Sequence, residues 1–108
     1  MILDNGERPD PSTVPSLGEL RTGIDDIDRQ IMELYGKRFE LTTYVGHRKA
    51  IDSITAVDPL REEQQFQRAT ELAEQYNVPV DLAQSVLRLV IDAVVEEHKR
   101  IRTLYEGE

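Results

Sequence analysis

The sequence predicts an all-α protein of three helices, the first of them very long. Apolar residues recur every three or four positions through three stretches, which is the spacing of one helix face. Breaks that contain or border proline separate the stretches, and helix-capping residues mark the first two starts. No stretch alternates apolar and polar residues as a strand does.

The first helix is predicted to begin after Ser16 and to end at about Ile51. Ser16 followed by Glu19 is a capping-box signature, and no proline interrupts the residues that follow. A seven-residue apolar repeat runs along this stretch: Leu17, Ile24, Ile31 and Val45. Such a helix is about 50 Å long, whereas a compact domain of this size has a radius of gyration of about 13 Å.

A second copy of the chain is expected to cover the apolar stripe of this helix. Most oligomers are symmetric and two-fold, so the sequence predicts an intertwined homodimeric bundle. The alternative is a helix that folds back on itself at Gly36.

The second helix is predicted from Asp58, a helix N-cap followed by a first-turn proline, to about Tyr76. Residues 77–79 form the next break, and the third helix runs from there to about Leu104.

The 108 residues are enough for one domain and too few for two. Residues 1–15 hold three prolines and no periodicity, which predicts a flexible N-terminal tail. Residues 16–108 are predicted to form the helical domain.

Composition excludes several classes of function. A formal charge of −8 argues against general nucleic-acid binding, which needs a basic footprint. The sequence contains no apolar run near the ~18 residues of a membrane span, and its first residues do not form a secretory signal. It has no cysteine, and hence no disulfide framework or thiolate zinc site. Together these features predict a cytoplasmic location.

Four ionisable residues interrupt the apolar stripes where core residues are expected. Arg38 and Lys49 lie on the first stripe, Glu62 begins the second, and His98 lies within the third. Burying charge is unfavourable unless the charge is paired. The set therefore predicts a polar pocket for a small anion inside a helical bundle.

Each residue also has a structural interpretation. Asp58 is most simply a helix cap, Arg61 a surface residue, and Glu62 a favourable charge at a helix N-terminus. His98 is explained as a satisfied histidine at the bundle rim, and His47 is expected to be exposed. The two histidines lie on different helices without metal-binding spacing, so no metal site is predicted. Nor does the sequence contain a phosphate loop or a nucleophile elbow.

Helix geometry separates the three arginine and lysine positions. Arg38 and Lys49 are eleven residues apart, which places them on one face about 16 Å apart along the axis. Arg21 precedes Arg38 by seventeen residues, or about 25 Å and 100° around the helix. Within one helix Arg21 cannot serve the same pocket, but in a two-fold dimer it could reach the pocket of the partner.

These residues resemble the all-helical class of chorismate mutases over about residues 17–104. The matching segments are LRTGIDDIDRQIMELYGKRFELTTYVGHRKA, DPLREEQQ and LVIDAVVEEHKRI. In that family an arginine opens the first helix, a second follows 17 residues later, a lysine lies 11 beyond it, and an Asp-x-x-Arg-Glu motif starts the second helix. Those slots are filled here by Arg21, Arg38, Lys49, Asp58, Arg61 and Glu62.

The resemblance implies an interlocked homodimer that rearranges chorismate to prephenate in aromatic amino acid (Phe/Tyr) biosynthesis, without a cofactor. Arg38 and the partner's Arg21 would bind the two carboxylates, and Lys49 would hydrogen-bond the ether oxygen. Glu62 would take the ring hydroxyl. Asp58 and Arg61 would support that end of the pocket.

Two positions on the third helix depart from the best-known members. His98 stands where Gln or Glu often faces the ether oxygen, and it can still donate a hydrogen bond. Val94 stands where Ser can touch a carboxylate, which implies a weaker or rearranged grip on that group.

Two other functions remain open at the level of sequence. An isochorismate pyruvate lyase on the same fold would bind a similar dianion and eliminate pyruvate. A non-catalytic helical dimer would act as a regulatory or interaction module. Activation by a larger partner enzyme is open as well.

Overall fold

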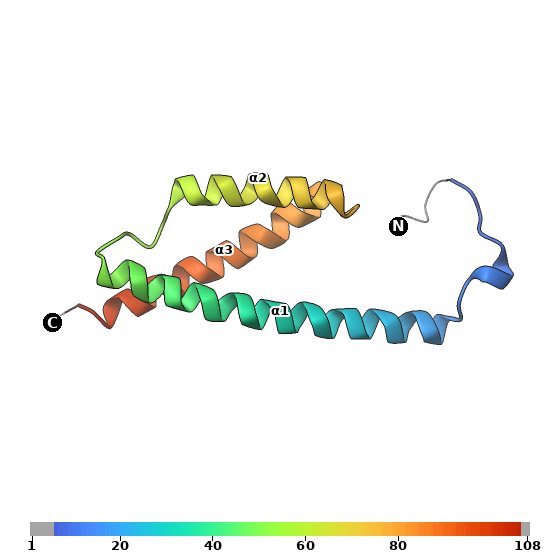
Figure 1. Cartoon of the computed structure of the whole chain (residues 1–108), viewed down its shortest axis with the longest axis horizontal. Helices are drawn as coiled ribbons and strands as arrows, with labels where there is room; N and C mark the ends of the chain where they lie inside the picture. Colours follow the sequence, from blue (N-terminus) through green and yellow to red (C-terminus); the bar gives the residue numbers. More distant parts are fainter. Residues whose placement is uncertain (1–5, 107–108) are drawn as a thin grey trace. The chain divides into compact units, whose positions relative to one another are not determined.

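The computed structural model describes residues 6–106, in which no strand occurs (Figure 1). The elements are a 3-10 turn η1 (Pro11–Thr13) and the α-helices α1 (Leu17–Ile51), α2 (Pro59–Gln75) and α3 (Val80–Thr103). The predicted all-α class, with three helices and a long first one, is confirmed. The chain divides into two compact units whose boundary falls within α1, between Arg38 and Phe39, and each unit is described by itself.

The predicted N-terminal tail contains the turn η1. The backbone N–H of Ser12 donates a 3.0 Å hydrogen bond to Oδ1 of Asp10, and this bond lowers the pKa of the Asp10 carboxyl. Residues 1–5 of the tail lie outside the described residues. The described part of the tail therefore contains local structure, and its flexibility stays a prediction.

Helix α1 begins and ends where local signals place its ends. Oγ of Ser16 accepts a 3.2 Å hydrogen bond from the backbone N–H of Glu19, as the capping box predicts. At the other end Ser53 adopts a left-handed φ of 58°. Between them α1 continues through Gly36, so the alternative of a helix folded back at this residue is wrong. A helical glycine costs about 1 kcal/mol, which 35 residues of helix tolerate.

Helices α2 and α3 pack against each other in opposite directions. Oδ1 of Asp58 caps α2 by accepting a 3.1 Å hydrogen bond from the backbone N–H of Arg61. The left-handed φ of 58° at Asn77 then turns the chain into α3. Nε2 of Gln84 on α3 donates a 3.1 Å hydrogen bond to Oγ1 of Thr70 on α2.

The core of the second unit is small. Its buried apolar side chains are Ala73, Ile91 and Ile101, and they are accompanied by the buried imidazole of His98. Gly46 of α1 is also buried, and a Cβ there would lie 2.6 Å from Cδ2 of His98 and 2.9 Å from Cδ1 of Ile101. Only glycine allows α3 side chains to approach the α1 backbone this closely.

Most large apolar side chains of α1 remain exposed. The predicted stripe positions Leu17, Ile24, Ile31 and Val45 all belong to this group. Exposed apolar faces are common at sites of protein–protein contact. Within residues 6–106 no helix has both the length and the apolar character needed to cross a membrane.

We expect Gly46→Ala to lower the free energy of unfolding by about 1–3 kcal/mol, because the added methyl group would overlap His98 and Ile101. Gly36→Ala is the matched control on the same helix, since a Cβ there meets nothing within 4 Å. This control should be neutral or stabilising by up to about 1 kcal/mol. Urea unfolding at one protein concentration measures both, and equal stabilities would contradict the packing at Gly46.

Candidate functional site

The start of α2 carries three of the predicted site residues, the N-cap and two residues of the first turn. Asp58 is the helix cap, so its carboxylate already accepts a backbone hydrogen bond. Arg61 lies in the first turn and is exposed. Glu62, one residue further, is only 20% exposed and contacts α3. The cap fixes where α2 begins and thereby fixes the positions of Arg61 and Glu62.

Arg88 on α3 is a partner of Glu62 that the sequence analysis missed. Its Nη2 donates a 3.0 Å hydrogen bond to Oε1 of Glu62, and Nη2 also lies 2.9 Å from Oδ1 of Asp92. The guanidinium carbon sits 5.3 Å from the ring centre of Phe66, within range of a cation–π interaction. The hydrogen bond to Glu62 raises the pKa of Arg88 above its ordinary value. The spacing of Arg88 and Asp92 predicts a pair on α3, but nothing in the sequence points to Glu62.

Lys49 lies half-buried in the last turn of α1. Its Nζ donates a 3.3 Å hydrogen bond to the backbone carbonyl of Ala56 in the loop between α1 and α2. Nearby, Nη1 of Arg102 donates a 3.0 Å hydrogen bond to the carbonyl of Ile54 in the same loop. Two cations therefore hold the loop that leads to the Asp58 cap.

His98 is 4% exposed, and its two ring nitrogens have different surroundings. Nε2 lies 2.7 Å from the backbone carbonyl oxygen of Thr42 on α1. Because a carbonyl only accepts, Nε2 must carry a proton and donate it to this bond. Nδ1 is buried and has no hydrogen-bond partner within the described part of the chain. A neutral His98 therefore presents Nδ1 as an acceptor, and Nδ1 can donate only from the imidazolium form.

The structure brings Lys49 and His98 to the same place. Both line one small cavity, together with Gly46, Ala50, Ile54, Ala56 and Arg102. The cavity is too small to hold a water molecule. Val94 lies half-buried on α3, one turn before His98.

Arg21 and Arg38 belong to the first unit. Arg21 is exposed on α1. Arg38 is half-buried, and its Nη1 is a buried nitrogen without a hydrogen-bond partner among residues 6–106. A buried guanidinium N–H without an acceptor is unfavourable.

The expectation that His47 is exposed is wrong. His47 is half-buried, with Nδ1 2.6 Å from the hydroxyl oxygen of Tyr105 and the two rings in edge-on contact. Tyr105 follows α3, so the contact ties the end of α3 to α1. Sequence separation hides this pair, since the two residues are 58 positions apart.

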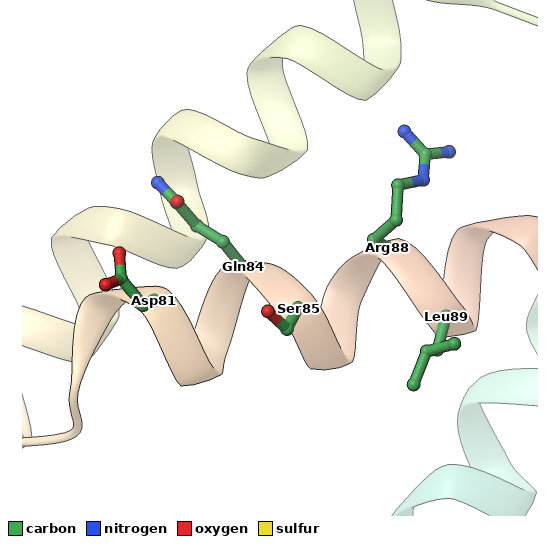
Figure 2. A pocket seen from close by; sticks show the side chains of 5 residues that line it. All are labelled: Asp81, Gln84, Ser85, Arg88 and Leu89. Atoms are coloured by element: carbon green, nitrogen blue, oxygen red, sulfur yellow. The ribbon is translucent and has the colours of Figure 1, made fainter.

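A wider surface pocket lies on α3 and contains none of the predicted site residues (Figure 2). It is lined by Asp81, Gln84, Ser85, Arg88 and Leu89. Figure 2 shows Gln84 and Arg88 extending toward α2, whereas Ser85 and Leu89 lie on the other side of α3. Within the described residues, no group of three or more His, Cys, Asp or Glu side chains could hold a metal ion.

We expect His98→Gln to leave the free energy of unfolding within about 1 kcal/mol of the parent, because the glutamine amide can also donate to the Thr42 carbonyl. His98→Ala removes both this bond and the buried ring, and should lower stability by about 2–4 kcal/mol. Chemical denaturation measures the difference. Equal losses in the two variants would show that the hydrogen bond to Thr42 does not matter.

Comparison with known proteins identifies relatives of this chain. Residues 20–99 match the family model described as chorismate mutase type II. The chain is 35% identical over 77 residues to a T-protein of Haemophilus influenzae, and 34% identical over 93 residues to a T-protein of Enterobacter agglomerans. These matches cover 71% and 84% of the chain, but only 20% and 25% of the two T-proteins.

A shorter relative matches over most of its own length. The chorismate mutase of Methanocaldococcus jannaschii is 29% identical over 79 residues, which cover 73% of this chain and 80% of that protein. The family predicted from residue spacing is therefore confirmed. Because the family model matches most of the residues of this chain, the chain belongs to the chorismate mutase type II family.

Proposed function

We propose that this protein is a chorismate mutase that rearranges chorismate to prephenate in aromatic amino acid biosynthesis. The observation that carries the proposal is the extent of the family match, residues 20–99. That range contains every predicted site residue, from Arg21 to His98. The reaction is a single pericyclic step, so it needs orientation and electrostatic stabilisation rather than a nucleophile.

Two arginines bind the substrate carboxylates in this proposal. Arg38 and the partner's Arg21 hold the enolpyruvyl arm over the ring, which converts binding energy into orientation. The unpartnered Nη1 of Arg38 supports this role, because a substrate carboxylate would supply its missing acceptor.

Lys49 stabilises negative charge on the ether oxygen as the bond to it stretches. Its Nζ is held by one 3.3 Å bond to a backbone carbonyl, and the ether oxygen can replace that acceptor. His98 assists from α3, either from the imidazolium form through Nδ1 or by releasing the Thr42 carbonyl and donating through Nε2.

The ring hydroxyl is bound at the start of α2. Glu62 accepts its hydrogen bond, and Asp58 and Arg61 support this end of the pocket. The half-buried position of Glu62 supports this assignment, because a partly desolvated carboxylate forms a stronger hydrogen bond. Val94 contributes apolar contact in place of a hydrogen bond to a carboxylate.

The active form is an intertwined homodimer in which each chain completes the site of the other. The exposed apolar face of α1 supports this, because a second copy would remove that face from water. The cytoplasmic location predicted from the sequence is part of the same proposal.

Lys49→Ala should lower the rate of chorismate conversion by about 10²- to 10³-fold, because it removes a preorganised donor to the developing charge. Lys37→Ala on the same helix is the control, since Lys37 is exposed and its ion pair within residues 6–106 is with Glu33 alone. Prephenate formation is measured at saturating chorismate, and pyruvate release is measured in parallel to detect lyase activity. Near-parental turnover by the Lys49 variant would refute the electrostatic role.

Arg21→Ala chains mixed with Lys49→Ala chains should regain activity that neither has alone. A heterodimer joins the intact Lys49 of one chain to the intact Arg21 of the other, so about a quarter of all sites are restored in an equal mixture. The mixture is refolded from denaturant to exchange subunits, and turnover is compared with each variant refolded alone. No gain after exchange would show that Arg21 does not act across the interface.

A further inference from the structure

The ion pair between Glu62 and Arg88 differs from the others in the described part of the chain. It joins α2 to α3 across 26 positions, whereas every other ion pair there joins residues three or four positions apart. The Glu62 side chain is also the least exposed carboxylate among these pairs, at 20%. Exposed ion pairs contribute little to stability, so a pair with this placement calls for another explanation.

Three contacts fix the Arg88 guanidinium on the seam between the two helices. Oδ1 of Asp92, one turn further along α3, accepts a 3.0 Å hydrogen bond from Nε and lies 2.9 Å from Nη2 in an ion pair. Phe66, one turn beyond Glu62 on α2, supports the guanidinium through its ring. Asp92 and Phe66 therefore orient the Arg88 side chain independently of Glu62. In this orientation Nη2 points at the Glu62 carboxylate.

Arg88 engages only one oxygen of Glu62. Oε1 accepts the 3.0 Å bond from Nη2, and the hydrogen bonds formed within residues 6–106 leave Oε2 unengaged. A carboxylate held by one oxygen loses rotamer freedom before any ligand arrives. Its second oxygen then offers an acceptor in a fixed position to a hydroxyl group.

We propose that Arg88 is a positioning residue that holds the Glu62 side chain in one orientation, so that Oε2 receives the ring hydroxyl of the substrate. The inference rests on the proposed function. Arg88 acts through Glu62 and does not itself touch the substrate. Its contribution is made before binding and remains in the transition state, so it lowers KM more than it raises kcat.

The test compares Arg88→Met and Arg88→Lys with Arg68→Met as a matched control. Arg68 is an exposed arginine on α2 whose ion pair, among the residues that the structure describes, is with Glu71 alone. Its loss changes the net charge by the same amount. Arg88→Met should raise KM for chorismate about tenfold with a smaller effect on kcat. Arg88→Lys keeps the charge but loses the planar fork, and should fall between the parent and Arg88→Met. Thermal unfolding identifies any variant that fails to fold. If Arg88→Met does not fold, the KM of Arg88→Lys is compared with that of the Arg68→Met control instead.

A double-mutant cycle separates positioning from a general structural role. In a Glu62→Ala background, Arg88→Met should change KM by less than about twofold, because Arg88 then has no side-chain acceptor left to position. A full additional loss in that background would overturn the proposal, as would an Arg88→Met protein with the same KM as the Arg68→Met control. A parent protein that converts no chorismate would instead overturn the proposed function itself.

Discussion

The close approach of α3 to the backbone of α1 at Gly46 is the constraint on which the second unit depends. Where the α1 backbone carries no side chain, the His98 ring and Ile101 occupy the space that a Cβ would need. This approach allows Nε2 of His98 to donate to the Thr42 carbonyl one turn earlier on α1. It also places His98 beside Lys49 in one small cavity. A buried polar ring is tolerated because one of its nitrogens is satisfied by the backbone.

The seam between α2 and α3 is polar where it approaches the candidate site. From the start of α2 onward, Glu62 meets Arg88, Phe66 lies against the same guanidinium, and Thr70 meets Gln84. These residues are one helical turn apart on each helix, so one antiparallel register satisfies them all. The register of the helices and the orientation of the Glu62 carboxylate are therefore linked. A polar seam of this kind specifies one alignment of two helices, whereas an apolar seam accepts several.

The small core and the exposed face of α1 belong together. Few apolar side chains of the described chain are buried, while large apolar residues along α1 face solvent. A long amphipathic helix obtains most of its stability from covering its apolar face rather than from helix propensity. The proposed homodimer would cover this face. It would also bring the partner's Arg21 to the site, which Arg21 of the same chain is too far along α1 to reach. In this proposal, folding and completion of the active site are the same event.

The sequence alone determined the helices and their ends, and it pointed to the family that the comparisons confirm. Ser16 and Asp58 were identified as caps because a cap bonds the backbone only three residues away, so the signal is local. The relative positions of Arg21, Arg38 and Lys49 could also be calculated from the sequence, because a helix has a fixed rise and rotation per residue. The assignment of these residues to substrate groups remains a proposal.

Only the tertiary structure decided which side chains meet between helices. The partner of Glu62, the bond between His98 and Thr42, and the contact of His47 with Tyr105 join residues 26, 56 and 58 positions apart. Such pairs depend on helix register and on how closely the backbones approach, neither of which the hydrophobic pattern specifies. His47 was therefore expected in solvent, and His98 was assigned a role without its tautomer. The interrupted stripes show where polar groups are buried, but packing determines which atoms satisfy them.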